Sequence, residues 1–147
     1  MTDASTVGLP VYPGDDTCFG CGEANSDGLQ MVFRRTGTHV VESEFAVPLH
    51  LCGSPTVVHG GIQATILDEV IGKASHTAFA MDDPRRVVTV EFSLRYRRPV
   101  PIATPIIARG EMLRVDGADV FLRGELRGAD GTVFTTAEAR WKAIGPA

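Results

Sequence analysis

The sequence has few cysteines, few aromatic residues and no excess of positive charge. Its 147 residues include three cysteines, and aromatic residues make up 7%. A small, odd number of cysteines argues against a framework of disulfide bonds. The formal net charge is -4, so no overall positive field attracts nucleic acid, and we expect no nucleic-acid partner.

Long apolar runs are also missing. No stretch approaches the roughly 20 apolar residues that cross a bilayer. The first ten residues, MTDASTVGLP, lack the basic start and apolar centre of a signal peptide. These absences predict a cytoplasmic protein without a membrane partner. An anionic ligand would have to be bound by local positive groups.

The remaining composition suits one globular domain. Apolar residues make up 44% and charged residues 22%, which is enough for a core and does not indicate disorder. Residues 1–17 contain prolines, a glycine and paired acids, and predict an extended lead-in. Residues 18–147 form the predicted single domain.

Apolar periodicity and turn residues predict six strands and one long helix. Two strands at 29–35 and 40–47 are joined by a turn at 36–38, a loop covers 48–58, the helix covers 60–80, and strands follow at about 86–98, 105–115, 119–128 and 132–142. Asp116-Gly117 and Asp130-Gly131 are typical of hairpin turns. This order predicts an α+β fold in which an antiparallel sheet curls around the helix.

The predicted helix has an apolar face and a charged face. At about 100° per residue, the apolar face contains Ile66, Leu67, Val70, Ile71 and Ala74, which we expect to contact the core. Glu69 precedes Lys73 by four residues, the favoured order for an exposed ion pair. Both are therefore expected to lie at the surface.

Asp68 is the unusual carboxylate of this helix. Its neighbours on the helical wheel are small and uncharged, namely Gly61, Ala64, Gly72 and Ser75. A carboxylate beside a groove of small residues leaves room for a reactant and often has a raised pKa, as a general base requires. The plainer interpretation is that Asp68 binds a neighbouring hydroxyl or backbone group and has a structural role.

The start of the helix offers a second functional candidate. His59-Gly60-Gly61 precedes the apolar pattern. The first N–H groups of a helix have no internal partner and carry partial positive charge, so those of Gly60 and Gly61 could bind a developing oxyanion. Two glycines also occur in ordinary turns.

The two candidates are too far apart to act together within one helix. Asp68 follows Gly61 by seven residues, which is about 10–11 Å along the axis. Reacting atoms must approach to about 3–3.5 Å. Combined action therefore requires a second subunit whose helix runs antiparallel, and this predicts a two-fold dimer with two composite sites.

Three motifs together resemble the hotdog-fold thioesterases of the PaaI-like group, which includes the human thioesterase superfamily members. The first is the nine-residue step from the histidine of His59-Gly60-Gly61 to Asp68. The second is the stretch 88–101, VTVEFSLRYRRPVP, and the third is the stretch 18–29, CFGCGEANSDGL. These motifs cover roughly residues 18–101.

The resemblance implies a hotdog fold, with a five- to six-stranded antiparallel sheet around one long helix, assembled as a dimer and often a tetramer. It implies an acyl-CoA thioesterase without a cofactor or metal. The Gly60 N–H would bind the thioester oxygen, and Asp68 of the partner chain would be the general base for water or the nucleophile. Thr89 would position Asp68 or the water, and His59 would shape the loop.

One position departs from the pattern of the family. Some members carry an asparagine six residues before the motif histidine, where this sequence has Gly53. The departure keeps open a protein that binds acyl-CoA or another hydrophobic ligand without turnover. The motifs do not specify the substrate, so a thioesterase for acyl-carrier-protein substrates also remains an alternative. A hotdog dehydratase would need a histidine paired with an acid in a different arrangement.

The strand after the helix alternates in a way that predicts its two faces. Val88, Val90, Phe92, Leu94 and Tyr96 alternate with Thr89, Glu91, Ser93, Arg95 and Arg97. Period two places the first set on the core face and Thr89 on the opposite face. Thr89 is then either an ordinary β-branched strand residue or part of a subunit cleft.

The densest group of positive charge lies in the same region, at Arg85, Arg86, Arg95, Arg97 and Arg98. Guanidinium groups suit the phosphates of CoA, although surface arginines are usually only solvated. We expect Arg97 or Arg98, followed by Arg95, to bind phosphate.

The cysteines allow one further interpretation. Cys18 and Cys21 could form a zinc site with His50 and Cys52, but this spacing matches known sites poorly. Thiols buried as small apolar groups are the preferred prediction.

Overall fold

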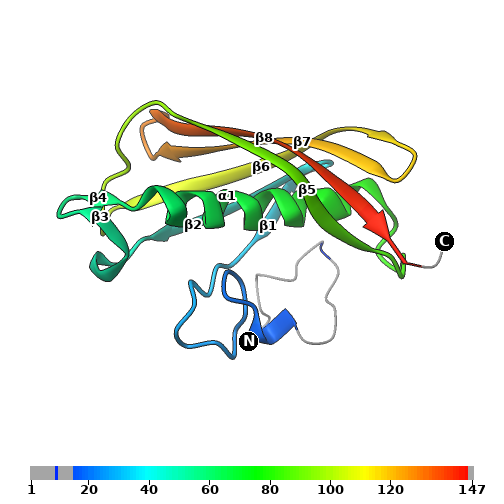
Figure 1. Ribbon diagram of the computed structural model, residues 1–147, viewed down its shortest axis with the longest axis horizontal. Coiled ribbons are helices and arrows are strands. Elements are labelled where there is room, and N and C mark those ends of the chain that lie inside the picture. Colours follow the sequence, from blue (N-terminus) through cyan, green and yellow to red (C-terminus); the bar gives the residue numbers. More distant parts are fainter. Residues whose placement is uncertain (1–8, 10–14, 146–147) are drawn as a thin grey trace.

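One long helix lies across one face of a curved antiparallel sheet (Figure 1). The computed structural model describes Leu9 and residues 15–145, so the predicted lead-in at 1–17 lies largely outside the described residues. The strands of the main sheet are β1 Arg34–Gly37, β2 Val40–Ala46, β5 Arg86–Tyr96, β6 Pro105–Asp116, β7 Asp119–Gly128 and β8 Val133–Ile144. Among the described residues, no helix has the length and apolarity needed to span a membrane.

The main sheet has the order β1-β2-β6-β7-β8-β5, and every neighbouring pair is antiparallel. The predicted hairpin turns occur where expected, because Gly117 and Gly131 take positive φ angles of 61° and 87°. The order leaves β5 at one edge of the sheet. The predicted α+β architecture, a sheet around one helix, is confirmed.

The helix α1, Gly60–Ser75, packs its apolar face on the inside of the sheet. The five residues of the predicted core face, Ile66, Leu67, Val70, Ile71 and Ala74, are all fully buried. The α-helix ends earlier than the predicted residue 80, and a 3-10 turn, η4 His76–Ala78, follows it.

Other boundaries also differ from the prediction. The first strand begins at Arg34 rather than at residue 29. The predicted loop at 48–58 contains a 3-10 turn, η3 Leu49–Leu51, and a small hairpin of β3 Cys52–Ser54 with β4 Val57–Val58. This hairpin leads directly into α1.

The predicted faces of β5 are wrong for the first half of the strand. Val88 and Val90 are 38% and 43% exposed, whereas Val87 is buried. The cause is a β-bulge, because Thr89 pairs with Trp141 and Glu91 pairs with the next residue, Arg140, so that Val90 has no partner. The bulge shifts the alternation by one residue and turns Thr89 towards α1.

The segment 18–33 covers the charged face of α1. The sequence predicted that Glu69 and Lys73 on this face are exposed, but both are only partly exposed. Met31 and Phe33 of this segment are 2% and 1% exposed. Lys73 lies 5.5 Å from the centre of the Phe33 ring, and Glu69 accepts a weak hydrogen bond from the Cys18 thiol. No ion pair joins Glu69 to Lys73 among the described contacts, so the predicted surface pair is wrong.

Candidate active site

The start of α1 is organised by His59. Its imidazole Nδ1 accepts a hydrogen bond of 2.9 Å from the amide of Gly61. The amide of Gly60, as the first helical residue, has no partner within the helix. His59 therefore occupies one of the two amides that the sequence suggested for an oxyanion and leaves the other available.

Tyr96 lies over this helix start from the end of β5. Its hydroxyl donates a hydrogen bond of 2.8 Å to the carbonyl of Gly60, and its ring would be 3.6 Å from a Cβ placed on Gly60. The sequence assigned Tyr96 to the core face, but 54% of the residue is exposed. Sequence reasoning missed this contact, because the two residues are 36 positions apart.

Asp68 and Thr89 form the second half of the candidate site. The Thr89 hydroxyl donates a hydrogen bond of 2.9 Å to Asp68 Oδ1. Partial burial raises the pKa of Asp68, and this hydrogen bond lowers it in part. The Asp68 carboxylate is half-buried. None of the ion pairs among the described residues includes Asp68. The arrangement suits a carboxylate that accepts a proton.

The two halves of the site lie far apart within one chain. Because α1 continues without a break from Gly60 to Ser75, Asp68 lies about 12 Å along the axis from Gly60 at about 1.5 Å per residue. One molecule therefore does not bring Asp68 to an oxygen bound at Gly60.

Gly53 approaches the same helix start. A Cβ placed on Gly53 would lie 3.2 Å from the Cα of His59, a tight contact. Gly53, the position that departs from the expected motif pattern, is thus in direct contact with the motif histidine, and any side chain there would displace it slightly.

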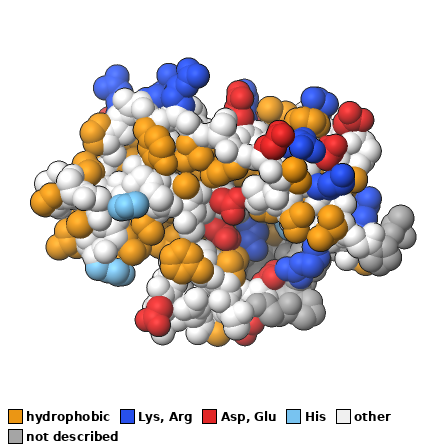
Figure 2. Space-filling model, in the orientation of Figure 1, with side chains coloured by type: hydrophobic (Ala, Val, Ile, Leu, Met, Phe, Trp, Pro, Cys, Tyr) orange, Lys and Arg blue, Asp and Glu red, His pale blue; other side chains and the backbone are white. Residues whose placement is uncertain are grey.

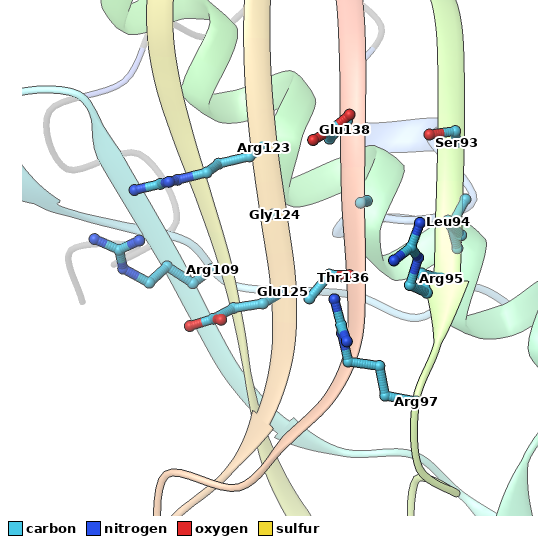
Figure 3. A pocket seen from close by; sticks show the side chains of 11 residues that line it. Ser93, Leu94, Arg95, Arg97, Arg109, Arg123, Gly124, Glu125, Thr136 and Glu138 are labelled. Atoms are coloured by element: carbon cyan, nitrogen blue, oxygen red, sulfur yellow. The ribbon is translucent and has the colours of Figure 1, made fainter.

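The predicted phosphate-binding arginines line two cavities at the end of β5. Arg95 and Arg97 line a cavity of about 600 Å³ on the face of the sheet opposite α1, which they share with Arg109 and Arg123 (Figure 3). Arg97 and Arg98 line a second cavity of about 590 Å³. Arg97 belongs to both cavities.

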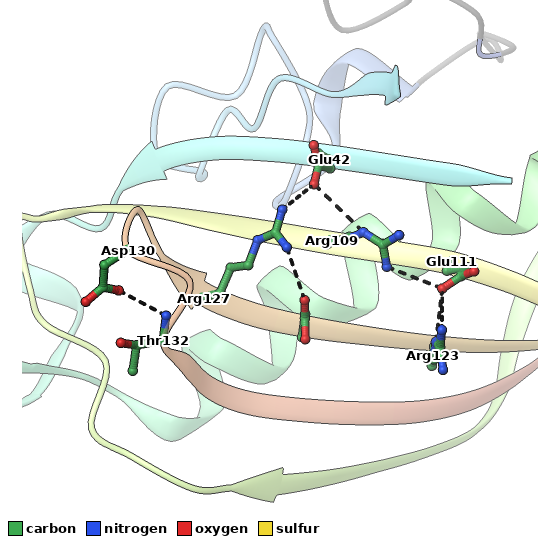
Figure 4. A network of polar contacts seen from close by, with 8 residues as sticks. Glu42, Arg109, Glu111, Arg123, Arg127, Asp130 and Thr132 are labelled. Carbon is green, nitrogen blue, oxygen red and sulfur yellow. Dashed lines mark hydrogen bonds and ion pairs between the residues drawn. The ribbon is translucent and has the colours of Figure 1, made fainter. Parts of the chain in front are cut away.

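These arginines differ in their ion pairs. Arg109 and Arg123 share the carboxylate of Glu111, at 3.3 and 2.9 Å, within a network that extends to Glu42 (Figure 4). Arg95 and Arg97 have no ion-pair partner among the contacts described. Their guanidinium groups are therefore the ones available to an anion.

The cysteines separate into two places. The side chains of Cys18, Cys21 and Glu69 have ligand atoms within 4.8 Å of one another, and burial raises the pKa of the Cys21 thiol. His50 and Cys52 lie on η3 and β3, and neither belongs to this cluster. The four residues that the sequence suggested for zinc do not therefore lie together. Glu69, which was predicted to be at the surface, lies beside Cys18 and Cys21 instead of His50 and Cys52.

Comparison with known proteins identifies the family. Residues 56–135 match the model of the thioesterase superfamily. The chain is 27% identical to mouse acyl-coenzyme A thioesterase THEM4 over 105 residues, which are 71% of this chain and 43% of that protein.

Two solved structures share the fold. One is a crystal structure of a thioesterase superfamily protein, with a TM-score of 0.76 and 28% identity over 84% of this chain and 62% of that chain. The other is a phenylacetic acid degradation-related protein from Ralstonia eutropha, with a TM-score of 0.68 and 24% identity over 79% of this chain and 86% of that chain.

The fold and the matched residues define a hotdog-fold protein, as the motifs predicted. The chain belongs to the thioesterase superfamily. It spans less than half the length of the mouse relative that it matches.

Proposed function

We propose that this protein hydrolyses an acyl-CoA thioester. The observation that carries the proposal is the half-buried Asp68, held by Thr89 and raised in pKa, in a chain whose helix start offers the amide of Gly60. The likeness to a protein named acyl-coenzyme A thioesterase supports the same reaction.

In the proposed reaction, Asp68 is the general base. Its carboxylate takes a proton from water as the oxygen attacks the thioester carbon. The tetrahedral intermediate then breaks its C–S bond, and Asp68 returns the proton to the departing thiolate. The hydrogen bond from Thr89 fixes the orientation of the carboxylate, so that one oxygen faces the water.

The amide of Gly60 stabilises the oxyanion in this scheme. It sits at the positive end of α1, and the neighbouring amide of Gly61 is already bound by His59. The hydrogen bond from the Tyr96 hydroxyl to the carbonyl oxygen of Gly60 helps to hold the backbone of Gly60 in place. The Gly60 amide therefore keeps its position for binding the oxyanion.

The site is composite, formed by two chains related by a two-fold axis. Asp68 of one chain would act on a thioester bound at Gly60 of the other, since the two lie about 12 Å apart along one helix. The edge strand β5 supports this arrangement, because its exposed Val88 and Val90 offer apolar surface beside Thr89.

Arg97 and Arg98 would bind the phosphates of CoA, with Arg95 beside them. Arg97 directly follows Tyr96, whose hydroxyl reaches Gly60. A substrate with its thioester at Gly60 thus finds unpaired guanidinium groups at the same end of β5.

The release of free thiol from short, long, aromatic and branched acyl-CoAs tests the proposal. We expect wild-type turnover on at least one substrate, and a loss of about 100-fold or more with Asp68→Asn, the range of a general base. Tight binding of acyl-CoA without turnover would favour a binding protein. Turnover confined to acyl-carrier-protein substrates would change the carrier but keep the reaction.

A pair of substitutions at Gly60 tests the oxyanion donor. Gly60→Pro removes the amide N–H at a helix position that tolerates proline, whereas Gly60→Ala keeps it and adds a methyl group in ordinary contact with Tyr96. We expect Gly60→Pro to lower kcat about 100- to 1,000-fold relative to Gly60→Ala. Equal rates for the two variants would exclude this amide as the donor.

A further inference from the structure

Two thiols and one carboxylate from distant parts of the chain meet on the covered face of α1. The Cys18 thiol lies 3.5 Å from Glu69 Oε1, and the ligand atoms of Cys18, Cys21 and Glu69 all lie within 4.8 Å of one another. The amide of Cys21 also points to the Cys18 sulfur, at 3.4 Å. The proposed hydrolysis uses none of these groups.

Glycine makes this meeting possible. A Cβ on Gly20, between the two cysteines, would lie 2.2 Å from Cγ of Glu69, so any other residue there would displace the carboxylate. The segment is further tied down by hydrogen bonds from Leu29 to Phe19 and from Met31 to Gly20. The cluster is thus built into the packing of the segment on α1.

The donor set matches zinc in chemistry and size. Thiolates together with a carboxylate are a zinc-type set, with Zn–S of about 2.3 Å and Zn–O of about 2.0–2.2 Å. A tetrahedral ion with those bond lengths separates a sulfur from an oxygen by about 3.6 Å and two sulfurs by about 3.8 Å. The observed 3.5 Å between Cys18 Sγ and Glu69 Oε1 is close to the first value. The two sulfurs lie no more than 4.8 Å apart, so binding an ion at the second value needs them to move by about 1 Å at most.

The surroundings provide room for a fourth ligand and a balancing charge. The cluster opens onto a cavity of about 150 Å³, large enough for a water molecule, which Trp141 also lines. Trp141 is 8% exposed, and its indole Nε1 has no hydrogen-bond partner among the described residues. Lys73 lines the same cavity, and its charge would neutralise the net single negative charge of a zinc ion with two thiolates and a carboxylate.

We propose that Cys18, Cys21 and Glu69 bind one zinc ion, which fastens the segment 18–33 to α1. Figure 1 shows this N-terminal part of the chain beside the helix. Figure 2, in the same orientation, shows a hollow with acidic and basic side chains near the middle of the visible face. The ion has a structural role and leaves the proposed hydrolysis without a metal-dependent step.

The test is metal binding by the full chain, kept reduced with a phosphine and freed of metal by a chelator. Titration with Co²⁺ should give the absorption of a thiolate-bound tetrahedral ion at one equivalent per chain, and Zn²⁺ should displace it. Zn²⁺ should also raise the unfolding temperature, because only the folded chain brings Glu69 to the two cysteines and so binds the ion more tightly than the unfolded chain does.

Three variants make the test specific. Cys18→Ser with Cys21→Ser should abolish the Co²⁺ spectrum and the thermal shift, whereas Cys52→Ser, which lies outside the cluster, should keep both. Glu69→Gln, which retains the shape of the side chain, should weaken zinc binding by more than the about 10- to 100-fold that follows loss of an outer-shell partner.

The proposal is overturned if the reduced wild-type chain binds no metal, or if Cys52→Ser loses binding as the double variant does. Because no thioester is present, neither result depends on the proposed hydrolysis. Circular dichroism of the double variant shows whether it is folded. If it is unfolded, the loss of zinc affinity in Glu69→Gln decides the test instead.

Discussion

At the scale of single residues, Asp68 is subject to two opposing influences. Burial raises its pKa, and the hydrogen bond from Thr89 lowers it. A base must be deprotonated to accept a proton, so the activity of the proposed site should rise with pH through the pKa of Asp68.

Thr89→Ala should move that rise to higher pH. Without the hydroxyl, the contribution that lowers the pKa of Asp68 is lost, whereas burial still raises it. Profiles of kcat/KM against pH for wild type, Thr89→Ala and Thr89→Ser measure the effect. Thr89→Ser keeps the hydroxyl and should follow the wild type; coincidence of the alanine and wild-type profiles would contradict the positioning role.

Asp68→Asn should make the protein more stable at pH 7 while making it less active. The pKa of Asp68 is higher in the folded than in the unfolded chain, so the folded chain binds more protons between the two values and stability falls as pH rises through them. The neutral side chain of asparagine does not ionise, so the variant does not lose stability in this way. Thermal unfolding at pH 7 should show a higher Tm for the variant, and the difference should shrink as the pH falls towards about 3.9 and be absent below it.

At the scale of elements, glycines bring the sheet close to the helix. A Cβ on Gly110 of β6 would lie 2.6 Å from the carbonyl oxygen of Val70, and one on Gly124 of β7 would lie 2.8 Å from Cδ1 of Ile71. The first contact is with the backbone of α1, which cannot rotate away. The separation between helix and sheet therefore depends on Gly110.

Gly110→Ala should destabilise the fold by about 1–3 kcal/mol, as overpacked cores do. Gly37→Ala is the matched control, because its Cβ would meet only Val40 at an ordinary 3.4 Å. Urea unfolding of both variants measures the difference. Similar free energies of unfolding would show that α1 can shift at little cost.

At the scale of the whole molecule, the proposed composite site requires two chains. Val90 on the β5 edge is 43% exposed, and Val115 near the β6–β7 turn is 42% exposed. If the proposed dimer forms through this edge, Val90→Asp should leave monomers and lower activity about as far as the loss of Asp68 does, about 100-fold. Val115→Asp should do neither, as light scattering and thiol release would show.

Mixing two inactive variants tests the shared site directly. In a heterodimer of Asp68→Asn with Gly60→Pro, one site keeps both Gly60 and Asp68 if each site draws on two chains. Unfolding and refolding the mixture should then restore about a quarter of wild-type activity, since half of the dimers are mixed and carry one intact site. Sites contained within single chains would restore nothing.

Local patterns in the sequence determined most of the secondary structure, the core face of the helix and the family. The 3.6-residue period placed Ile66, Leu67 and Val70 in the core, and the glycines of the turns marked the hairpins. The step from the motif histidine to Asp68 indicated the family and the candidate base. Such patterns are readable because burial repeats along each element and turns impose their own backbone angles.

The tertiary structure alone decided which side chains meet. The bulge at Val90 turned Thr89 towards Asp68, against the period-two prediction, and the path of the segment 18–33 brought Cys18 to Glu69. Tyr96 reached Gly60 in the same way. These contacts join residues 21 to 51 positions apart, and they depend on strand register and chain path, which the periodicity within one element does not specify.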